Sequence, residues 1–172
     1  MKVVKRMKWI GGTQTAKTAY FAAVESHIRY GLISWGGTSE TNLNKILVLQ
    51  KKAVRALSGL GPTESCKEAF KLHNILTVTA LYIHAVVLHT DKLDLPRNEN
   101  FHSYNTRNAT DYSLPAHHTT QYSKKPSYIG RKIINALPNH LKNMKGNALK
   151  KHLRDWLVER PVYSLKEFFD TL

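Results

Sequence analysis

Apolar residues recur every three or four positions in two neighbouring stretches near the N-terminus, the spacing of helices that bury one side. The first stretch is Thr15–Ser34, the second is Ser39–Ser58, and Gly36-Gly37 separates them. The apolar positions are Tyr20, Phe21, Val24, Ile28 and Leu32 in the first, and Leu43, Ile46, Leu47, Ala53, Val54 and Leu57 in the second. The pattern predicts two helices packed against each other as a hairpin.

The second predicted helix separates its charged residues from its apolar residues. At about 100° per residue, its cationic side chains project away from the apolar stripe. These cations are Lys45, Lys51, Lys52 and Arg55. Gln50 falls at the centre of the apolar stripe, where a satisfied core hydrogen bond explains it better than a catalytic role. We predict a helix that packs with one side and presents positive charge with the other.

Helical patterns continue through the rest of the chain, and no strand pattern of useful length occurs. Thr77–Thr90 is apolar nearly all round, which predicts a central helix packed on several sides. Pro126–Leu137 and Asn147–Arg160 are amphipathic, and Ser164–Leu172 forms a last helical turn. We therefore predict an all-α fold, in which the hairpin packs with a buried central helix, a long irregular loop and a C-terminal helical segment.

Single residues predict several of the boundaries. Met1–Gly12 precedes the first apolar stripe, so we expect a frayed lead-in. Gly31 is costly inside a helix and predicts either a close approach of the backbone or a kink. Gly59 suits the left-handed position that ends a helix. Thr63 is then expected to cap a short helix that runs to about Leu72.

The charge of the chain is large and unevenly distributed. Its 172 residues include 26 Lys and Arg against 12 Asp and Glu, a formal net charge of +14. Residues 1–62 carry ten of these cations and two acids, whereas residues 63–95 carry three cations and four acids. Such an excess favours polyanionic partners, nucleic acid first and an anionic membrane second. The predicted segments are a basic hairpin (1–62), core helices (63–95), an irregular polar loop (96–125) and C-terminal helices (126–172).

Cysteine content favours a reducing compartment, and the length of the apolar runs argues against a membrane-spanning segment. The single cysteine, Cys66, excludes a disulfide within the chain and a cysteine-rich zinc module. The longest apolar run, Val78–Leu88, is too short and too interrupted to span a membrane. The basic residues of the first segment are not followed by the apolar run of a signal peptide. We expect an intracellular protein, nuclear or cytoplasmic, without a membrane partner.

The stretch Asp91–Lys125 is polar and rich in turn-forming residues, which predicts little regular structure. Within it, Phe101–Asn108 interleaves aromatic and polar side chains. That composition suits contact with sugars, phosphates or bases, and it equally suits a loop whose side chains satisfy its own turns. His102, His117 and His118 lack the ligand spacing and the neighbouring cysteines of a zinc site, so we predict no bound metal.

Residues that would carry catalysis are not recognisable in the sequence. It contains no phosphate-binding Walker loop, no G-x-S-x-G, no H-E-x-x-H and no adjacent aspartate pair for two-metal phosphoryl transfer. The acidic residues are scattered along the chain. We therefore predict a protein that is not an enzyme and that needs no cofactor.

Several short segments, in their order along the chain, resemble the thumb and downstream region of jockey-type non-LTR retrotransposon reverse transcriptases. Taken singly the segments are weakly specific, and together they extend from about Ala16 to Phe169. They are Thr18–Phe21, Glu25–Gly31, Ile33–Gly36, Leu49–Arg55, Glu64–Phe70, Ile75–Val78, His102–Arg107, Tyr128–Gly130, Asn135–Pro138 and Tyr163–Phe169.

The resemblance implies an RNA-directed DNA polymerase family and a thumb-like hairpin at residues 1–62. In that family an endonuclease and the polymerase fingers and palm precede this region, and the palm holds the metal-binding aspartates. Nothing in the sequence matches these parts. We therefore expect a truncated element tail without polymerase activity.

These observations together predict a non-catalytic fragment that binds RNA and DNA through charge, with little preference for sequence. Alternatives are a helical module that docks on a polymerase palm, in trans, or on another protein, and a non-functional relic of a decayed element. The predicted nucleic-acid-binding residues are Arg29, Lys45, Lys51, Lys52, Arg55, Arg107, Lys124, Lys125, Arg131 and Lys132.

Overall fold

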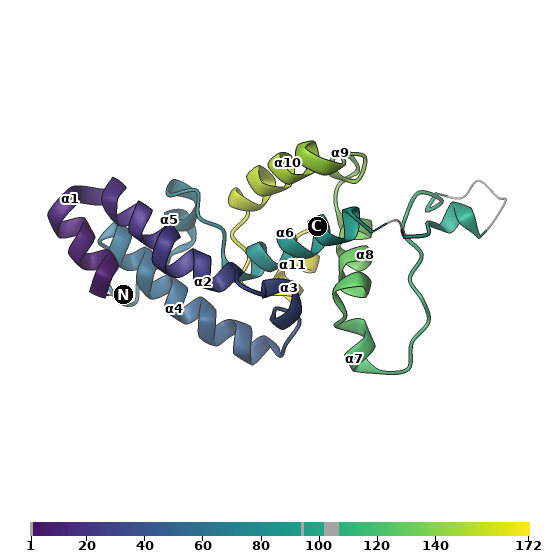
Figure 1. The fold of residues 1–172 in the computed structure, drawn as a ribbon, viewed down its shortest axis with the longest axis horizontal. Coiled ribbons are helices and arrows are strands. Elements are labelled where there is room, and N and C mark those ends of the chain that lie inside the picture. The colour runs from purple at the N-terminus through teal and green to yellow at the C-terminus, as the bar shows by residue number, and fades with distance from the viewer. Residues whose placement is uncertain (1, 94, 102–106) are drawn as a thin grey trace.

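The computed structural model describes residues 2–93, 95–101 and 107–172, and these residues form an all-helical protein without a sheet (Figure 1). The predicted fold class is confirmed. No helix in the described part of the chain has the length and apolar character needed to cross a bilayer. The helices are α1 (Lys2–Tyr20), α2 (Ser26–Arg29), α3 (Leu32–Trp35), α4 (Glu40–Ser58), α5 (Lys67–Leu72), α6 (Val78–Asp91), α7 (Thr120–Ser123), α8 (Pro126–Ala136), α9 (Asn139–Lys142), α10 (Gly146–Val158) and α11 (Leu165–Asp170), with a π-helical turn η1 (Phe21–Glu25) and a 3₁₀ turn η2 (Asn98–Asn100).

The predicted hairpin is present, with α1 lying along α4 (Figure 1). The ends of α4 are set by the residues that the sequence indicated. The Ser39 hydroxyl accepts a hydrogen bond from the Asn42 amide at 3.4 Å, and Gly59 ends the helix with φ +78°. The predicted bounds of the second helix are therefore confirmed.

The N-terminal part of the hairpin differs from the prediction. Residues 2–11 are helical rather than frayed, because Val4, 1% exposed, packs into the core. The helix bends at Gly12, where φ is +75°. It does not continue to Ser34, because Gly31 takes a left-handed φ of +61° and separates α2 from α3. Gly31 thus marks a break in the helix.

The short helix after α4 begins later than predicted, at Lys67 instead of Thr63. The preceding residues are held as a turn by side-chain contacts. The Arg55 guanidinium donates two hydrogen bonds to the Glu64 carbonyl, at 3.0 and 2.9 Å, and the Glu64 carboxylate accepts one from the Gly61 amide at 3.1 Å. The Glu64 carbonyl and carboxylate are therefore engaged in this turn, and a helix starting at Thr63 would have needed that carbonyl for its own hydrogen bonds.

Two hydrophobic clusters meet on α4. The larger surrounds α6, which α4, α8 and α10 all contact, and it includes Leu47. The smaller lies between α1, the end of α4 and α5, and it includes Tyr20. Gln50 joins the two, because its amide donates to the Tyr20 hydroxyl at 2.8 Å and to the Leu76 carbonyl at 2.9 Å, while it accepts from the Val78 amide at 2.8 Å. The prediction that Gln50 is a satisfied core residue is confirmed.

The polar loop follows α6, extends away from the helices at the end of the molecule opposite the N-terminus, and returns to α8 (Figure 1). Its return is fixed by Asn135, whose amide exchanges two hydrogen bonds of 2.8 Å with the backbone of Tyr112. The loop is irregular for most of its length, but it also contains η2 and α7, which the sequence did not predict. In the Phe101–Asn108 motif, residues 102–106 lie outside the described part of the chain.

Candidate functional site

The ten predicted nucleic-acid-binding residues divide into an exposed group and a half-buried group. The exposed residues are Arg29, Lys45, Lys52, Arg107, Lys124, Lys125 and Lys132. The half-buried residues are Lys51, Arg55 and Arg131. For the three half-buried residues, the prediction of an outward-facing cation is wrong.

Each half-buried cation makes contacts within the protein. The Lys51 ammonium lies 3.6 Å from the centre of the Tyr163 ring, and burial lowers its pKa. Arg55 holds the turn after α4, as described above. Arg131 donates from its guanidinium to the Ser113 carbonyl at 2.7 Å. Lys51 contacts the C-terminal segment, Arg55 the turn after α4 and Arg131 the polar loop, and helical spacing cannot show any of these contacts.

The outer face of α4 consequently has fewer free cations than its sequence suggests. Lys45 and Lys52 remain exposed on it. Between them along the helix lie Val48 and Leu49, which are 42% and 54% exposed. This face mixes two lysines with two apolar side chains.

A groove between α2, α6 and α10 gathers cations from distant parts of the chain. It has a volume of about 470 Å³, and none of the described residues that line it is acidic. In Figure 1, α10 and α4 lie at opposite edges of the view with α6 between them. The lining residues are Arg29, His84, Asn147, Lys150, Lys151 and Arg154. We call this site the α2–α10 groove.

The cations of the α2–α10 groove are partly fixed and partly free. Arg29 forms an ion pair with Glu25 at 2.8 Å, one helical turn earlier. Arg154 donates to the Asn74 carbonyl at 3.2 Å. Lys150 and Lys151 are exposed, and neither forms an ion pair within the described residues. The two arginines frame the groove, and the two lysines offer uncompensated charge.

The imidazole of His84 lies at the wall of this groove. It is buried, with Nε2 placed 3.2 Å from the Lys150 carbonyl, to which an Nε2–H would donate. Burial is the main cause that lowers the pKa of His84. The positive charges of Arg29, Arg154 and Lys150 lower that pKa further, while the hydrogen bond to the carbonyl opposes the change. The groove is therefore positive near neutral pH without any contribution from this histidine.

Sequence reasoning identified only Arg29 among the cations of the groove. The remaining three sit on α10, where the spacing of Lys150, Lys151 and Arg154 marks a solvated helix face and nothing more specific. The available signal was that residues 145–154 contain four Lys and Arg residues and no acidic residue. That signal becomes informative only when the helix is placed beside α2.

The predicted absence of a metal can be compared with the described histidines. Within the described residues no group of three or more His, Cys, Asp and Glu side chains could hold a metal ion. His117 packs its ring against Tyr128, with centres 4.5 Å apart, and His118 is exposed. His102 lies outside the described residues.

Comparison of this chain with protein-family models, with curated proteins and with solved structures gave no match.

Proposed function

We propose that this chain is a non-catalytic nucleic-acid-binding module whose main interface is the α2–α10 groove. The observation that carries the proposal is the convergence of four cationic side chains on a groove without an acidic lining residue. Nucleic acids present a closely spaced row of phosphates, and binding them releases condensed counterions. Sequence-tolerant, electrostatic binding of RNA and DNA is the function that this arrangement supports best.

The two kinds of cation suggest different roles in such binding. The planar arginine guanidinium can donate two hydrogen bonds to one phosphate in a fixed geometry, whereas lysine acts as a point charge. Arg29 and Arg154 are held by protein contacts, so they would orient a phosphate. Lys150 and Lys151 would follow the backbone of the strand.

The other exposed cations would extend contact beyond the groove. Lys124 lies just before α8 and Lys132 lies within it, and both line one cavity, whereas Lys45 and Lys52 lie on α4. We propose them as secondary phosphate contacts. The resemblance to a reverse-transcriptase thumb supports the same proposal, since that region grips a template–primer duplex, and we propose a retrotransposon origin on that basis.

Titration of the full chain with fluorescently labelled RNA and DNA, over a series of salt concentrations, tests the proposal. We expect the logarithm of the association constant to fall linearly with the logarithm of salt concentration, by about 0.9 per phosphate contact on duplex and about 0.7 on single strands. Binding absent at low salt, or binding that does not respond to salt, would contradict it. Primer extension with Mg²⁺ should give no product.

Exposed apolar side chains favour a second candidate, docking onto another protein. On α1, Trp9 is 88% exposed and Ile10 is 62% exposed, in addition to Val48 and Leu49 on α4. A docking module would be monodisperse in light scattering and would have no affinity for nucleic acid at low salt. Addition of nucleic acid to the same sample separates the two functions.

A further inference from the structure

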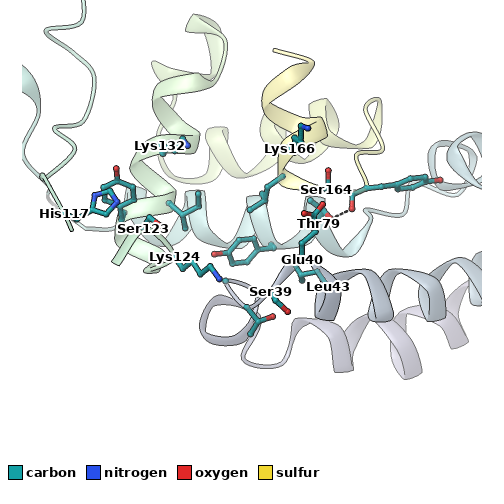
Figure 2. A pocket seen from close by; sticks show the side chains of 18 residues that line it. Ser39, Glu40, Leu43, Thr79, His117, Ser123, Lys124, Lys132, Ser164 and Lys166 are labelled. Carbon is teal, nitrogen blue, oxygen red and sulfur yellow. Dashed lines mark hydrogen bonds between the residues drawn. The ribbon is translucent and has the colours of Figure 1, made fainter. Parts of the chain in front are cut away.

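A second cavity lies between the start of α4, the α7–α8 segment and the start of α11 (Figure 2). Its volume is about 550 Å³, within the range of roughly 300–1,000 Å³ that small-ligand sites occupy. It is separate from the α2–α10 groove, with which it shares no lining residue. We call it the α4–α11 pocket.

The walls of the α4–α11 pocket combine apolar surface with hydroxyl groups. Leu43, Ile129 and Leu165 supply aliphatic surface, and Tyr128 supplies an aromatic ring. Hydroxyl groups come from Thr38, Ser39, Thr79, Ser123, Ser164, Tyr82, Tyr128 and Tyr163. Ser39, Thr79, Ser123 and Ser164 already make hydrogen bonds within the protein, but the Tyr82 hydroxyl has no partner among the described residues. A purely aliphatic ligand would leave it so, and the walls therefore suit a flat ligand with a polar edge.

Tyr82 has an unusual place in this pocket. Its side chain is fully buried and lines the cavity, but its hydroxyl has no hydrogen-bond partner among the described residues. Gly37 adjoins that hydroxyl, and Gly36 packs against the ring so closely that a Cβ there would clash. An unpaired buried hydroxyl costs free energy, which a ligand that bonded to it would recover.

The rim of the pocket is positively charged. Figure 2 shows Lys132 and Lys166 along one edge and Lys124 across from them. Glu40 is the one acidic residue among the described residues of the lining. The first turn of α4, a helix of 19 residues, also opens here and adds partial positive charge. The rim therefore favours an anion attached to whatever occupies the interior.

We propose that the α4–α11 pocket binds one unpaired nucleotide, with the base inside and the phosphate on the lysines of the rim. A nucleobase is flat, has a polar edge and can stack on an aromatic ring such as Tyr128. The nucleotide can be free, or it can be one residue of a bound strand. The second case rests on the proposed function, and the first does not.

Calorimetric titration of the full chain with the four common nucleoside monophosphates tests the base and the phosphate together. Ribose 5-phosphate is the control for the phosphate alone. We expect the nucleotides to bind at least tenfold more tightly than ribose 5-phosphate, because only they place a base in the pocket. Equal affinities, or no binding of any nucleotide, would overturn the proposal.

Two pairs of variants locate the binding. Lys132→Glu/Lys166→Glu should lower nucleotide affinity at least tenfold, whereas Lys92→Glu/Lys145→Glu, with the same change of charge elsewhere, should leave it within about twofold. Tyr82→Phe removes only the unpaired hydroxyl, so nucleotide affinity should fall roughly three- to tenfold without loss of thermal stability. Tyr30→Phe at an exposed site is its control. If a variant and its control lose the same amount of nucleotide affinity, the assignment of binding to the α4–α11 pocket is overturned.

A labelled oligonucleotide with one abasic position distinguishes a free nucleotide from a residue of a bound strand as the occupant of the pocket. If the pocket takes a residue of the strand, the unmodified oligonucleotide binds more tightly than the abasic one, and Lys132→Glu/Lys166→Glu abolishes the difference. If it takes a free nucleotide, monophosphates bind while the two oligonucleotides do not differ. Strand binding without any monophosphate or abasic effect refutes the pocket alone. Monophosphate binding without strand binding refutes the proposed function alone.

Discussion

The outer face of α4 and the α2–α10 groove are both basic, but they reach that state differently. Along α4 the cations are neighbours in sequence, and two of them, Lys51 and Arg55, are occupied by an aromatic ring and a carbonyl. In the groove the cations come from two helices far apart in sequence, and Lys150 and Lys151 make no described ion pair. If nucleic acid binds in the groove as proposed, charge that converges in space is a better guide to the site than charge along α4.

Reversing the two groove lysines should have the largest effect on binding. In Lys150→Glu/Lys151→Glu two phosphate contacts are lost and two repulsive charges are gained, so affinity for RNA or DNA at low salt should fall by about 100-fold. Fluorescence anisotropy with labelled RNA or DNA measures this affinity. The charge-matched variant Lys45→Glu/Lys52→Glu should lose less than about tenfold in the same affinity. A larger loss in this variant than in the groove variant would make the outer face of α4 the main interface.

Changing the occupied cations of α4 should affect stability more than binding. Arg55→Gln loses both hydrogen bonds to the Glu64 carbonyl, so the free energy of unfolding should fall by about 1 kcal/mol. Urea denaturation followed by circular dichroism measures this change. Nucleic-acid affinity should change by less than about threefold. An unchanged unfolding midpoint together with a large loss of affinity would place Arg55 in the interface.

The lowered pKa of His84 should make stability depend on pH. The unfolded chain takes up a proton at this residue as pH falls through about 6.5, whereas the folded imidazole, with its lowered pKa, takes one up only at lower pH. The unfolded state then binds more protons, so the free energy of unfolding falls as pH falls below about 6.5. Burial also lowers the pKa of His73, which adds to the trend.

The variant His84→Gln isolates the contribution of the groove. Thermal melts from pH 5 to pH 7.5 should show a weaker pH dependence in this variant than in the wild type, with the remainder assigned to His73. The same pH dependence in both proteins would mean that His84 does not contribute to it, which would contradict the lowered pKa of this imidazole.

The smallest effect is expected from the apolar residues on α4. Leu49→Lys adds a cation beside Lys45 and Lys52 without touching the core, because Leu49 is exposed. It should raise nucleic-acid affinity by no more than about threefold and leave stability within about 0.5 kcal/mol. Loss of a protein partner in this variant, with nucleic-acid binding unchanged, would instead identify the face as a docking surface.

Local signals in the sequence predicted those parts of the fold that depend on local chemistry. Ser39 and Gly59 fix the ends of α4, and the apolar run at α6 predicts its burial. Residues 2–11 were missed because only Val4 buries there, through contact with a distant cluster. The start of α5 was missed because Arg55 holds Glu64 in a turn.

The candidate site was less predictable than the fold, for a physical reason. The groove forms when α10 packs across α6 and brings Lys150 near Arg29, and a helical pattern does not specify which helix packs on which. Exposure was predicted correctly for Lys45 and Lys52, whose surroundings are local. Arg131, which was predicted to bind nucleic acid, is half-buried, because its partner, the Ser113 carbonyl, lies in a loop without a pattern.

The most direct test of the central claim compares salt dependence in two neutral variants. Lys150→Gln/Lys151→Gln and Lys45→Gln/Lys52→Gln remove the same charge, so a difference between them reports position alone. We expect the slope of log affinity against log salt, measured on a DNA duplex, to become shallower by about 1.8 in the groove variant and by less than about 0.9 in the α4 variant. A groove variant with the wild-type slope would contradict the account.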